Sequence, residues 1–499
     1  MKMVISLLFI KVSQLLNCKI MKFKILLILA ISLTLYSSCK KDLGNYVYSP
    51  PSEPVVSGLK DITFPALIGD SLIIKPEVTL ADANPVEDLD FEWQITVQEE
   101  LRAAVYKGYP LKTIYNLGPG ERRAVLVLTD KRNGLIYKYN FKIVGTTQFS
   151  DGDLVLSDDN GVAKLSYVKP DNSVMSDIYH ALNNKSLPHQ PVQLYYSKPL
   201  PYQPNTKEEY WVLCNDPEGS GVILDASSLL RRNDFNSQFF SPPVTVTPGY
   251  LEPFLGPVQM GTVPTGVING KLYVGIQSTA PFADDYGKFA NEQAGNYTMS
   301  KYFTHGSSFY IGFDLAAKAF ITFGGDGTYA GTSYPLAPES AGFDPKNVGM
   351  SNLIFMKPAE GGSSYAFFKA DDGNIYELSF SFPFSPTDRN FKALGKRVFK
   401  GSSLVNTDTK WVRTSLNVFY FSSNDKIYRY NPINEDLRVL TPDLAGKKVT
   451  MMKISANDNT LTVGVSGAVY TLDVSVGKTG NILNTVTGIP GNPVDMVIK

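Results

Sequence analysis

The chain has 499 residues, with 47 Lys and Arg against 47 Asp and Glu, so its formal net charge is zero. This balance argues against a dedicated nucleic-acid-binding protein, which would carry a basic excess, and a hydrophobic content of 43% argues against a mostly disordered chain. Three His and three Cys offer little material for a metal site or a His-based catalytic constellation, so no metal and no catalytic residue is predicted.

The first 38 residues have the pattern of a secretory signal peptide. A basic start at Met21 is followed by an apolar run over residues 25–35 and by small residues before Cys39. As a helix the run would rise only about 16 Å, short of a hydrocarbon core of roughly 30 Å, which argues against a transmembrane anchor. We expect translation to start at Met21, with residues 1–20 an upstream extension.

The position of Cys39 directly after the small residues resembles the bacterial lipoprotein signal. The resemblance implies that the Cys39 thiol carries diacylglycerol and that its amino group is acylated, with no other cofactor. The alternative is a plain secretion signal with an incidental cysteine. Residues 39–54 are then a lipidated tether. Cys214, in an apolar strand, is expected to be a buried thiol and not a nucleophile.

Residues 55–147 contain short strands separated by turn signals. Strands are predicted over residues 72–78 and 90–95, and a hairpin over 124–129 and 137–143. In the last strand, alternation places Tyr137, Tyr139, Phe141 and Ile143 on one face. About 90 residues with several strands and Trp93 as a central core residue favour an Ig-like β-sandwich without a disulfide.

A repeat of strand, polar turn and Tyr- or Leu-rich strand extends over residues 148–499. The six units begin at Leu154, Trp211, Leu272, Tyr365, Val418 and Leu461. The intervals suit propeller blades of roughly 40–50 residues plus loops, apart from a longer one after Leu272 that an insertion explains. The sequence therefore predicts an all-β fold in which the sandwich precedes a six-bladed β-propeller. Seven blades remain possible if the long interval hides one, and an open sandwich or barrel is the third alternative.

A second signature, Pro-Val followed by Gln or Asp and by Leu or Met, occurs at residues 191–194, 257–260 and 493–496. Each copy could be the innermost strand of a blade. The last copy has no unit after it, and the first unit, at Asp153, has no such strand before it. We therefore expect the C-terminal strand to pair into the blade that begins at Asp153, which would leave no exposed sheet edge there.

An aromatic-rich insertion at residues 279–307 is the most suggestive candidate for ligand binding. Its candidate ligand-binding residues are Tyr286, Tyr297, Tyr302, Phe303 and His305. Aromatic side chains on a long loop can stack on sugar faces or clamp peptide side chains. An equally weighted alternative is that these aromatics fold the loop over the propeller.

The remaining polar clusters indicate turns and surface loops. Asp158-Asp159 and Asp371-Asp372 precede Asn-Gly and Gly-Asn, which is hairpin chemistry and lacks the alternate carboxylates of a calcium loop. The three histidines lie far apart in the sequence, which by itself is typical of surface loops.

The layout of lipobox cysteine, Ig-like module and strand-rich repeat resembles the PKD-like family of Bacteroidota-type surface lipoproteins. The residues that carry the resemblance are 39–46, 117–122 and 153–157. Members are typically encoded beside SusC/SusD-type nutrient importers. The resemblance implies an outer-membrane lipoprotein that faces the cell exterior. Its function would be that of a non-catalytic accessory, which binds peptide or glycan nutrients and delivers them to a TonB-dependent importer of SusC/SusD type.

Two other functions remain open from the sequence. One is a propeller-type glycosidase or lyase that uses paired carboxylates, since 47 acidic residues could supply such a pair. The other is a structural adaptor of the importer complex. The scarcity of His and the absence of nucleophile-elbow and phosphate-loop motifs favour binding over catalysis.

Overall fold

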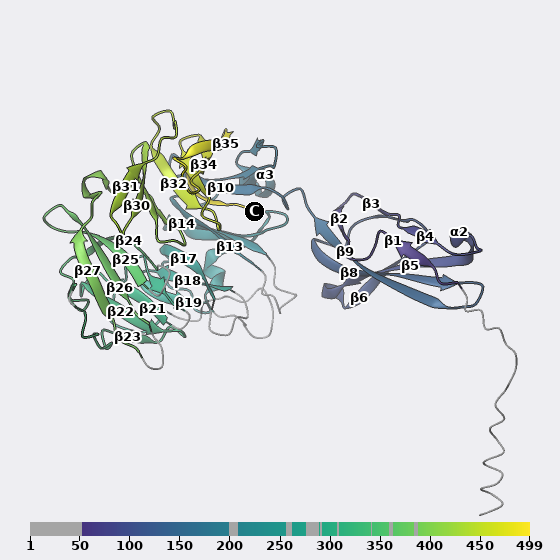
Figure 1. Cartoon of the computed structure of the whole chain (residues 1–499), viewed down its shortest axis with the longest axis horizontal. Coiled ribbons are helices and arrows are strands. Elements are labelled where there is room, and N and C mark those ends of the chain that lie inside the picture. Colours follow the sequence, from purple (N-terminus) through teal and green to yellow (C-terminus); the bar gives the residue numbers. More distant parts are fainter. Residues whose placement is uncertain are drawn as a thin grey trace, which may run out of the picture.

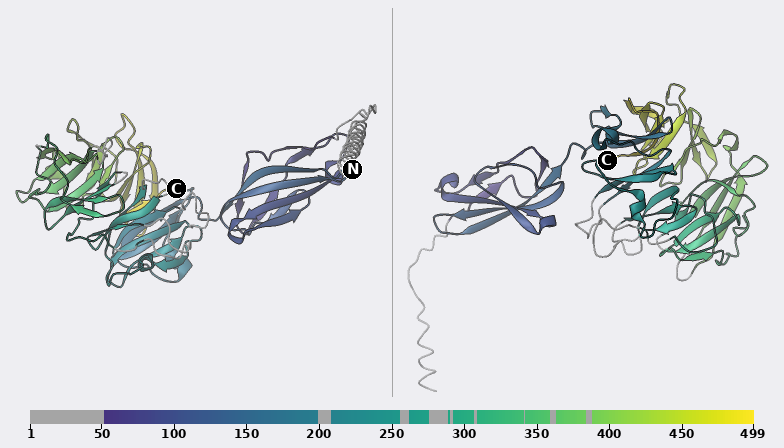
Figure 2. Two further views of the ribbon diagram at one scale, coloured as in Figure 1. Left: turned by 90° about the horizontal axis from the view of Figure 1, so that it is seen from below. Right: turned by 180° about the vertical axis from the view of Figure 1, so that it is seen from behind.

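The computed structural model describes residues 52–198, 208–255, 262–275, 289, 292–306, 309–340, 342–358, 363–383 and 388–499. They form two β-rich parts, an N-terminal sandwich and a larger C-terminal array of sheets (Figures 1 and 2). None of the helices in these segments is long and apolar enough to cross a membrane. Cys39 and Tyr286 lie outside the described residues.

The sandwich consists of a five-stranded sheet and two smaller strand pairs. The large sheet has the order β2-β9-β8-β5-β6, and the pairs are β1-β4 and β3-β7. The strands are β1 (Val55–Ser57), β2 (Thr63–Leu67), β3 (Ser71–Ile74), β4 (Glu77–Thr79), β5 (Leu89–Val97), β6 (Arg102–Lys107), β7 (Leu111–Ile114), β8 (Gly120–Asp130) and β9 (Ile136–Thr146). The short helices are α2 (Pro85–Asp88) and η1 (Gln98–Glu100).

The sandwich core confirms most of the predicted strands. Trp93 is fully buried, and its Nε1 donates a hydrogen bond to the Gly108 carbonyl at 2.8 Å. The predicted hairpin is present as β8 and β9, both longer than expected, and the aromatic face of β9 packs on the core. The single strand predicted over residues 72–78 is wrong. It is broken at Pro76, which has no N–H for a ladder, and its halves β3 and β4 pair with different strands.

The C-terminal part contains seven sheets among the described residues, all antiparallel. The first has the order β12-β11-β10-β36, and the other six follow chain order, with four strands each except the three-stranded β17-β18-β19. Their strands are β10 (Asp153–Asp159), β11 (Val162–Val168), β12 (Val174–Met175), β13 (Pro191–Ser197), β14 (Glu209–Asp216), β15 (Gly219–Asp225), β16 (Arg231–Asp234), β17 (Pro248–Leu255), β18 (Thr262–Ile268), β19 (Lys271–Val274), β20 (Thr304–His305), β21 (Phe309–Asp314), β22 (Ala319–Gly324), β23 (Tyr329–Gly331), β24 (Asn352–Pro358), β25 (Ser363–Lys369), β26 (Ile375–Ser381), β27 (Lys392–Val398), β28 (Trp411–Arg413), β29 (Phe419–Ser423), β30 (Lys426–Asn431), β31 (Asp436–Val439), β32 (Val449–Ile454), β33 (Thr460–Val465), β34 (Ala468–Asp473), β35 (Asn481–Thr487) and β36 (Asn492–Val497). The helices between them are α3 (Ile178–Asn183), η2 (Phe235–Gln238) and η4 (Ser402–Leu404).

This succession of four-stranded sheets is propeller-like, but the favoured count of six blades is wrong. The unit that was expected to be split by the insertion belongs to two sheets, because β19 pairs only with β18, whereas β21 pairs with β20 and β22. The long interval after Leu272 therefore contains the beginning of a further sheet, as the seven-bladed alternative anticipated.

The predicted pairing of the C-terminal strand is confirmed. β36 runs antiparallel to β10, with Leu154 opposite Val497 and Leu156 opposite Asp495. Pro493 and Pro191 lie in β36 and β13, which are edge strands of their sheets, where the missing N–H of proline is tolerated. The copy of the signature at 257–260 lies outside the described residues, and the edge strand of that sheet is β17.

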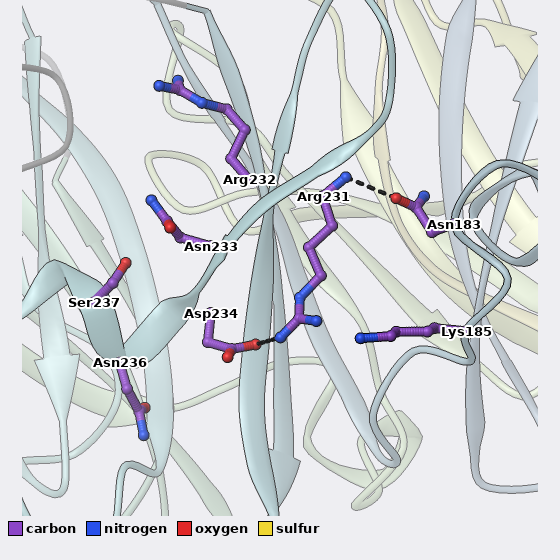
Figure 3. A pocket seen from close by; sticks show the side chains of 8 residues that line it. All are labelled: Asn183, Lys185, Arg231, Arg232, Asn233, Asp234, Asn236 and Ser237. Atoms are coloured by element: carbon purple, nitrogen blue, oxygen red, sulfur yellow. Dashed lines mark hydrogen bonds and ion pairs between the residues drawn. The ribbon is translucent and has the colours of Figure 1, made fainter.

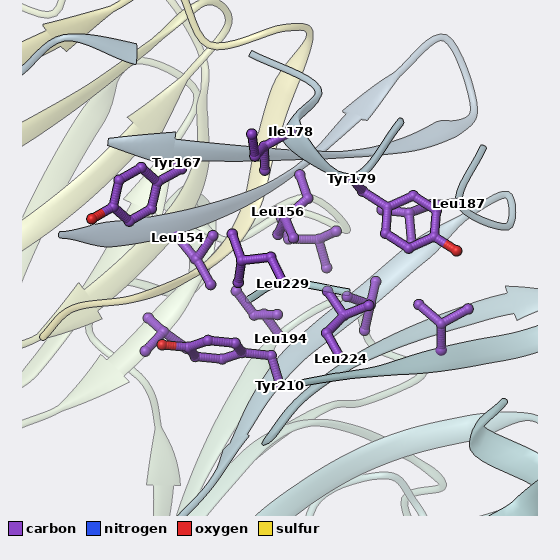
Figure 4. Packing of buried hydrophobic residues seen from close by; sticks show 14 of the residues in the cluster. Leu154, Leu156, Tyr167, Ile178, Tyr179, Leu187, Leu194, Tyr210, Leu224 and Leu229 are labelled. Atoms are coloured by element: carbon purple, nitrogen blue, oxygen red, sulfur yellow. The ribbon is translucent and has the colours of Figure 1, made fainter. Parts of the chain in front are cut away.

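A continuous apolar core fills the seam between the first two propeller-like sheets (Figure 4). Leu154 and Leu156 of β10 face Leu194 and Leu224 of the second sheet, and α3 closes the core with Tyr179. Cys214 belongs to this core and is fully buried, as predicted, and burial raises the pKa of its thiol to about 12. A thiol in this state is a packing residue.

The acidic pairs form turns, as predicted. Asn160 and Gly161 both have positive φ, 54° and 89°, as a two-residue hairpin turn requires. The Gly161 N–H donates to Asp158 Oδ1 at 2.6 Å, and the Asn374 N–H donates to Asp372 Oδ1 at 2.8 Å. These carboxylates serve the backbone of the turns.

Candidate functional site

Each of the seven sheets has one edge strand that lies nearest to the other sheets, which we call its inner strand. The inner strands are β13, β17, β20, β24, β28, β32 and β36. β13 contacts β17 and β36, β32 contacts β28 and β36, and β20 contacts β24, so the inner strands gather around a common axis. Side chains that project from these strands toward the axis come from positions far apart in the sequence. We call Tyr250, Glu252, His305, Lys357 and Arg413, with the contacts below, the axial cluster.

Glu252 is the centre of the axial cluster. Its carboxylate forms an ion pair with Lys357 Nζ, and its Oε2 lies 3.6 Å from Nε2 of His305. Lys357 Nζ also lies 4.6 Å from the centroid of the Tyr250 ring, within cation–π range. The side chains of Glu252, His305 and Lys357 are 12%, 24% and 22% exposed, so solvent reaches all three.

The environment of the cluster shifts its titrating groups toward their neutral forms. Burial, together with the charge of Arg413, lowers the pKa of Lys357 to about 7. Burial also lowers the pKa of His305 and raises the pKa of Tyr250. Groups whose pKa values are shifted by burial and by a neighbouring charge are characteristic of functional sites.

A second polar network joins neighbouring inner strands. Lys453 Nζ lies 3.1 Å from Asp495 Oδ1, and Asp495 Oδ2 accepts a hydrogen bond from the Leu194 N–H at 3.0 Å. Gln193 donates through Nε2 to the Leu251 carbonyl at 2.7 Å and accepts the Leu251 N–H at 2.9 Å. Gln193 and Asp495 therefore tie the inner strands together.

Two lysines precede inner strands at the start of β20 and β28. Burial lowers the pKa of both Lys301 and Lys410, and the positive charge of Lys301 lowers the pKa of Lys410 further. Lys301 Nζ lies 5.2 Å from the Tyr302 ring centroid. Neither ammonium forms an ion pair with any residue that the structure describes, so they can offer their charge to a ligand.

Two of the predicted ligand-binding residues are core residues, which corrects the prediction for them. Tyr297 is 4% and Phe303 is 1% exposed, both in one apolar cluster with Tyr310 and Phe323. They have no open ring face with which to contact a ligand. Phe289, from the same insertion, is fully buried in the neighbouring cluster.

The contacts of Tyr297 explain its position. Its hydroxyl donates to the Gln293 carbonyl at 2.7 Å, and its ring stacks on Tyr329 at a centroid distance of 4.9 Å. The Lys271 ammonium lies 4.2 Å from the centroid of the Tyr297 ring. For the described part of the insertion, the alternative in which the aromatics pack the loop on the sheets is therefore the better description.

Tyr302 and His305 are the two candidates that the structure brings to the axis. His305 contacts Glu252, and Tyr302 packs edge-on against Phe355 of β24 at 5.6 Å between ring centroids. Burial raises the pKa of Tyr302 to about 12. The expectation of a surface histidine is confirmed for His180 and His189, which are exposed. It is wrong for His305, which is half-buried.

Sequence reasoning missed Tyr250, Glu252, Lys357 and Arg413. A signal was present in the Pro-Val signature, because its third residue, Gln193 or Asp495, is polar in a strand that is otherwise apolar. The side chain at that position faces the neighbouring inner strands. Residues at the equivalent positions of the other inner strands were therefore candidates for the axial cluster. The described residues contain no group of three His, Cys, Asp or Glu side chains that could hold a metal ion.

One known family matches the N-terminal part of the chain. Residues 39–191 match the model of the PKD-like family, so the chain contains a PKD-like domain. The match covers the sandwich and extends into the first propeller-like sheet. No curated protein is detectably similar to the chain.

Three solved structures illustrate the distant similarities. A quinonprotein alcohol dehydrogenase-like protein from Bacteroides thetaiotaomicron VPI-5482 is 13% identical, with a TM-score of 0.43 over 89% of this chain and 99% of that chain. A candidate 6-phosphogluconolactonase from Bacteroides fragilis NCTC 9343 is 12% identical, with a TM-score of 0.39 over 70% and 98%. The extracellular domain of a one-component system from B. thetaiotaomicron is 8% identical, with a TM-score of 0.37 over 80% and 58%. Similarities this low assign neither an activity nor a ligand to this chain.

Proposed function

We propose that this chain is a lipid-anchored protein of the outer membrane, facing the cell exterior, that binds peptide or glycan nutrients and delivers them to a TonB-dependent importer of SusC/SusD type. In this proposal the lipid on Cys39 holds the chain at the membrane, the PKD-like domain is a spacer, and the seven sheets form a closed propeller whose axis holds the ligand. Tethering beside the importer raises the local concentration of the ligand.

The observation that carries the proposal is the convergence of Glu252, His305 and Lys357 from three separate sheets. Charged groups that are partly removed from water cost stability unless they are well paired. A fold that needed only to pack its axis could fill it with apolar side chains. Partly exposed, ionisable groups at the axis are therefore best explained by a polar ligand that they contact.

Two features favour binding over hydrolysis by paired carboxylates. A glycosidase holds two carboxyl groups across a cleft, one of them ready to act as an acid. Here Glu252 is paired with Lys357, while Asp495 is paired with Lys453 and accepts a backbone hydrogen bond. Both carboxylates are occupied by neighbouring cations, as expected for side chains that shape a binding surface.

The anchoring part of the proposal is tested by metabolic labelling with palmitate. The wild-type chain should incorporate label and partition with membranes, and Cys39→Ala should do neither. Cys18→Ala is the matched control, because residues 1–20 are proposed to lie outside the signal. Equal labelling of Cys39→Ala and wild type would contradict the proposal.

The binding part is tested with the purified full chain in detergent. A tryptic digest of casein and a set of neutral oligosaccharides (cellohexaose, xylohexaose and laminarihexaose) are passed over the immobilised protein. We expect the wild type to retain at least one probe and Lys357→Met to lose it. Lys426→Met, on the exposed side of β30, serves as the control. Retention of nothing by the wild type, or equal retention by Lys357→Met, would contradict axial binding.

The same experiment separates the adaptor and enzyme alternatives. A structural adaptor retains none of the probes but still copurifies with an importer. An enzyme releases shortened products continuously, and that release stops when Glu252 or Asp495 is replaced.

A further inference from the structure

An open, polar pocket lies at the outer end of the seam between the first two propeller-like sheets (Figure 3). It has a volume of about 700 Å³, within the ~300–1,000 Å³ typical of small-molecule sites. Its lining comes from the end of α3, from β16 and from η2. We call it the seam pocket. It is distinct from the axial cluster, since β16 is the outermost strand of its sheet and the axial residues lie on inner strands.

The lining is cationic and rich in amides. Lys185, Arg231 and Arg232 contribute three positive charges against one negative charge, that of Asp234. The other lining side chains are hydroxyl or carboxamide groups, those of Asn183, Asn233, Asn236 and Ser237. Among the residues that the structure describes, no aromatic or aliphatic residue lines the pocket. A concentration of cations is notable in a chain whose net charge is zero.

A β-bulge places the key arginine. In the pairing of β15 with β16, Leu224 lies opposite Arg231 and Ile223 lies opposite Asn233, so Arg232 is the extra residue. The bulge shifts the side-chain alternation, so that Arg231 falls on the same face as Leu224, toward the seam. In a regular strand, residues two apart lie on the same face, so Arg231 and Asn233 would share a face. With the bulge they lie on opposite faces.

Hydrogen bonds within the protein hold the lining of the pocket in place. The Arg231 N–H donates to Asn183 Oδ1 at 2.8 Å, and Asn183 Nδ2 donates to the carbonyls of Tyr179 and Leu229 at 3.1 and 3.2 Å. These bonds tie α3 to β16 above the buried core of the seam. On the other side, the Ser220 hydroxyl donates to Asn236 Oδ1 at 2.6 Å. Preorganised donors lose little entropy when a ligand binds.

The positive charges of the pocket are only partly compensated. Arg231 pairs with Asp234, and Arg232 pairs with Glu209 at 2.6 Å. Within the described part of the chain, Arg231 Nε has no hydrogen-bond partner. Lys185 is exposed, makes no ion pair with a described residue, and points toward the side of the pocket that holds the Arg231 guanidinium (Figure 3). Two like charges directed at one space favour an anion between them.

We infer that the seam pocket binds a carboxylated oligosaccharide, with a uronate carboxylate between Lys185 and Arg231 and with sugar hydroxyls on the asparagine amides. Arg and Lys recognise carboxylates through charge-assisted hydrogen bonds, and amides suit hydroxyl groups, which both donate and accept. A neutral sugar would lack the charge for this lining and would find no aromatic platform. A peptide with apolar side chains would find no aromatic or aliphatic residue among the described lining residues. The inference names a ligand class for the proposed nutrient-binding function, at a second site.

The test is isothermal titration of the full chain in detergent with trigalacturonate, and with galactotriose as the neutral probe. We expect trigalacturonate to bind, more weakly at high salt, and galactotriose not to bind. Lys185→Ala and Arg231→Gln should each weaken binding about tenfold, the usual effect of losing a hydrogen bond to a charged group. Lys169→Ala, a lysine exposed outside the pocket, is the charge-matched control and should bind as the wild type does.

Failure of binding to trigalacturonate, or equal affinity in Lys185→Ala and wild type, would overturn the inference. Preferential binding of tetra-aspartate would overturn the saccharide assignment in favour of an acidic peptide. Because Arg231→Gln can affect folding through Asp234, its thermal unfolding is compared with that of Lys185→Ala, whose side chain makes no contact that a fold requires. Lys357→Met should leave trigalacturonate binding unchanged. Loss of axial binding with retention at the seam, or the reverse, therefore separates this inference from the proposed function.

Discussion

The carboxylate of Glu252, on β17, pairs with the ammonium of Lys357, on β24, across the axis of the propeller-like array. The two residues belong to sheets that are separated by a further sheet in chain order, and His305 of that intervening sheet completes the contact. One carboxylate thus joins three sheets. The pair contributes to both the stability of the array and the chemistry of its axis, and the two contributions can be measured separately.

Breaking this ion pair should cost substantial stability. Removal of one member leaves a poorly solvated charge, so Glu252→Gln or Lys357→Met should lower the free energy of unfolding by about 3 kcal/mol. The loss of unfolding free energy in the double variant should be smaller than the sum of the losses in the two single variants, because the double variant has no uncompensated charge. Chemical denaturation at about pH 6, below the pKa of Lys357, where both groups are charged, measures all three. Lys426→Met removes an exposed partner of Asp425 and should change stability by less than about 0.5 kcal/mol. Additive effects at Glu252 and Lys357 would contradict a direct pair.

The pKa of Lys357 predicts how stability depends on pH. Burial and the charge of Arg413 hold this pKa near 7, below its ordinary value of 10.5. Between these two values the unfolded chain binds a proton that the folded chain does not, so the contribution of Lys357 to the free energy of unfolding rises with pH. Lys301 and Lys410, shifted in the same direction, add to the rise.

A comparison of wild type with Lys357→Met isolates this contribution, since the other lysines are common to both. Urea unfolding at about pH 7, 8 and 9 gives the free energy of unfolding of both proteins. The value for the wild type minus the value for Lys357→Met should increase with pH. A difference that is constant over this range would mean that Lys357 titrates at its ordinary pKa.

Tyr297 should act in folding and not in ligand binding. Its ring fills a fully enclosed space between β19 and Tyr329, so Tyr297→Ala should cost about 3–5 kcal/mol. Tyr297→Phe keeps the ring and loses the hydrogen bond to Gln293, at a cost of about 1 kcal/mol. Thermal unfolding checks both. Loss of ligand retention in Tyr297→Phe with unchanged stability would restore Tyr297 as a ligand-binding residue.

Local patterns predicted the parts of the fold that local chemistry determines. The Asn160-Gly161 turn and the alternation in β9 are properties of neighbouring residues, and both are present. The number of sheets was harder to predict from the sequence. The inner strand β20 contains only two residues, and a strand of that length shows no periodicity. A further sheet was therefore assigned to an insertion.

The axial cluster could not be predicted from local patterns for a different reason. Glu252, Lys357 and Arg413 lie in separate repeats, and each is a single charged residue in a strand of ordinary composition. Only the contacts between inner strands of different sheets bring them together. Aromatic residues gave a misleading signal, since Tyr297 and Phe303 are as suitable for a core as for a sugar-binding surface, and sequence does not distinguish exposed from buried rings.

The pairing of β36 with β10 predicts what truncation at the C-terminus does. A chain that ends at Gly491 lacks β36, so β10 keeps one edge without hydrogen-bond partners and the apolar side chains that β36 covers, such as Val155, become exposed. Unpaired strand edges associate with other chains. We therefore expect this truncated chain to form oligomers or aggregates, measured by light scattering of freshly purified protein.

A chain that ends at Val497 is the matched control, because it keeps all of β36 and loses only Ile498 and Lys499. It removes the hydrogen bond from the Lys499 N–H to Asp153 Oδ1 at 3.1 Å, on the exposed side, and the contacts of Lys499 Nζ with the ring centroids of Tyr196 and Tyr210 at 5.9 and 5.4 Å. An exposed hydrogen bond and cation–π contacts of this kind contribute about 1 kcal/mol each, too little to open the sheet. If both truncated chains stay monomeric, β36 is dispensable and the first sheet is stable with three strands. If only the shorter chain aggregates, the first and last segments of the array depend on each other, and the C-terminal strand completes the sheet.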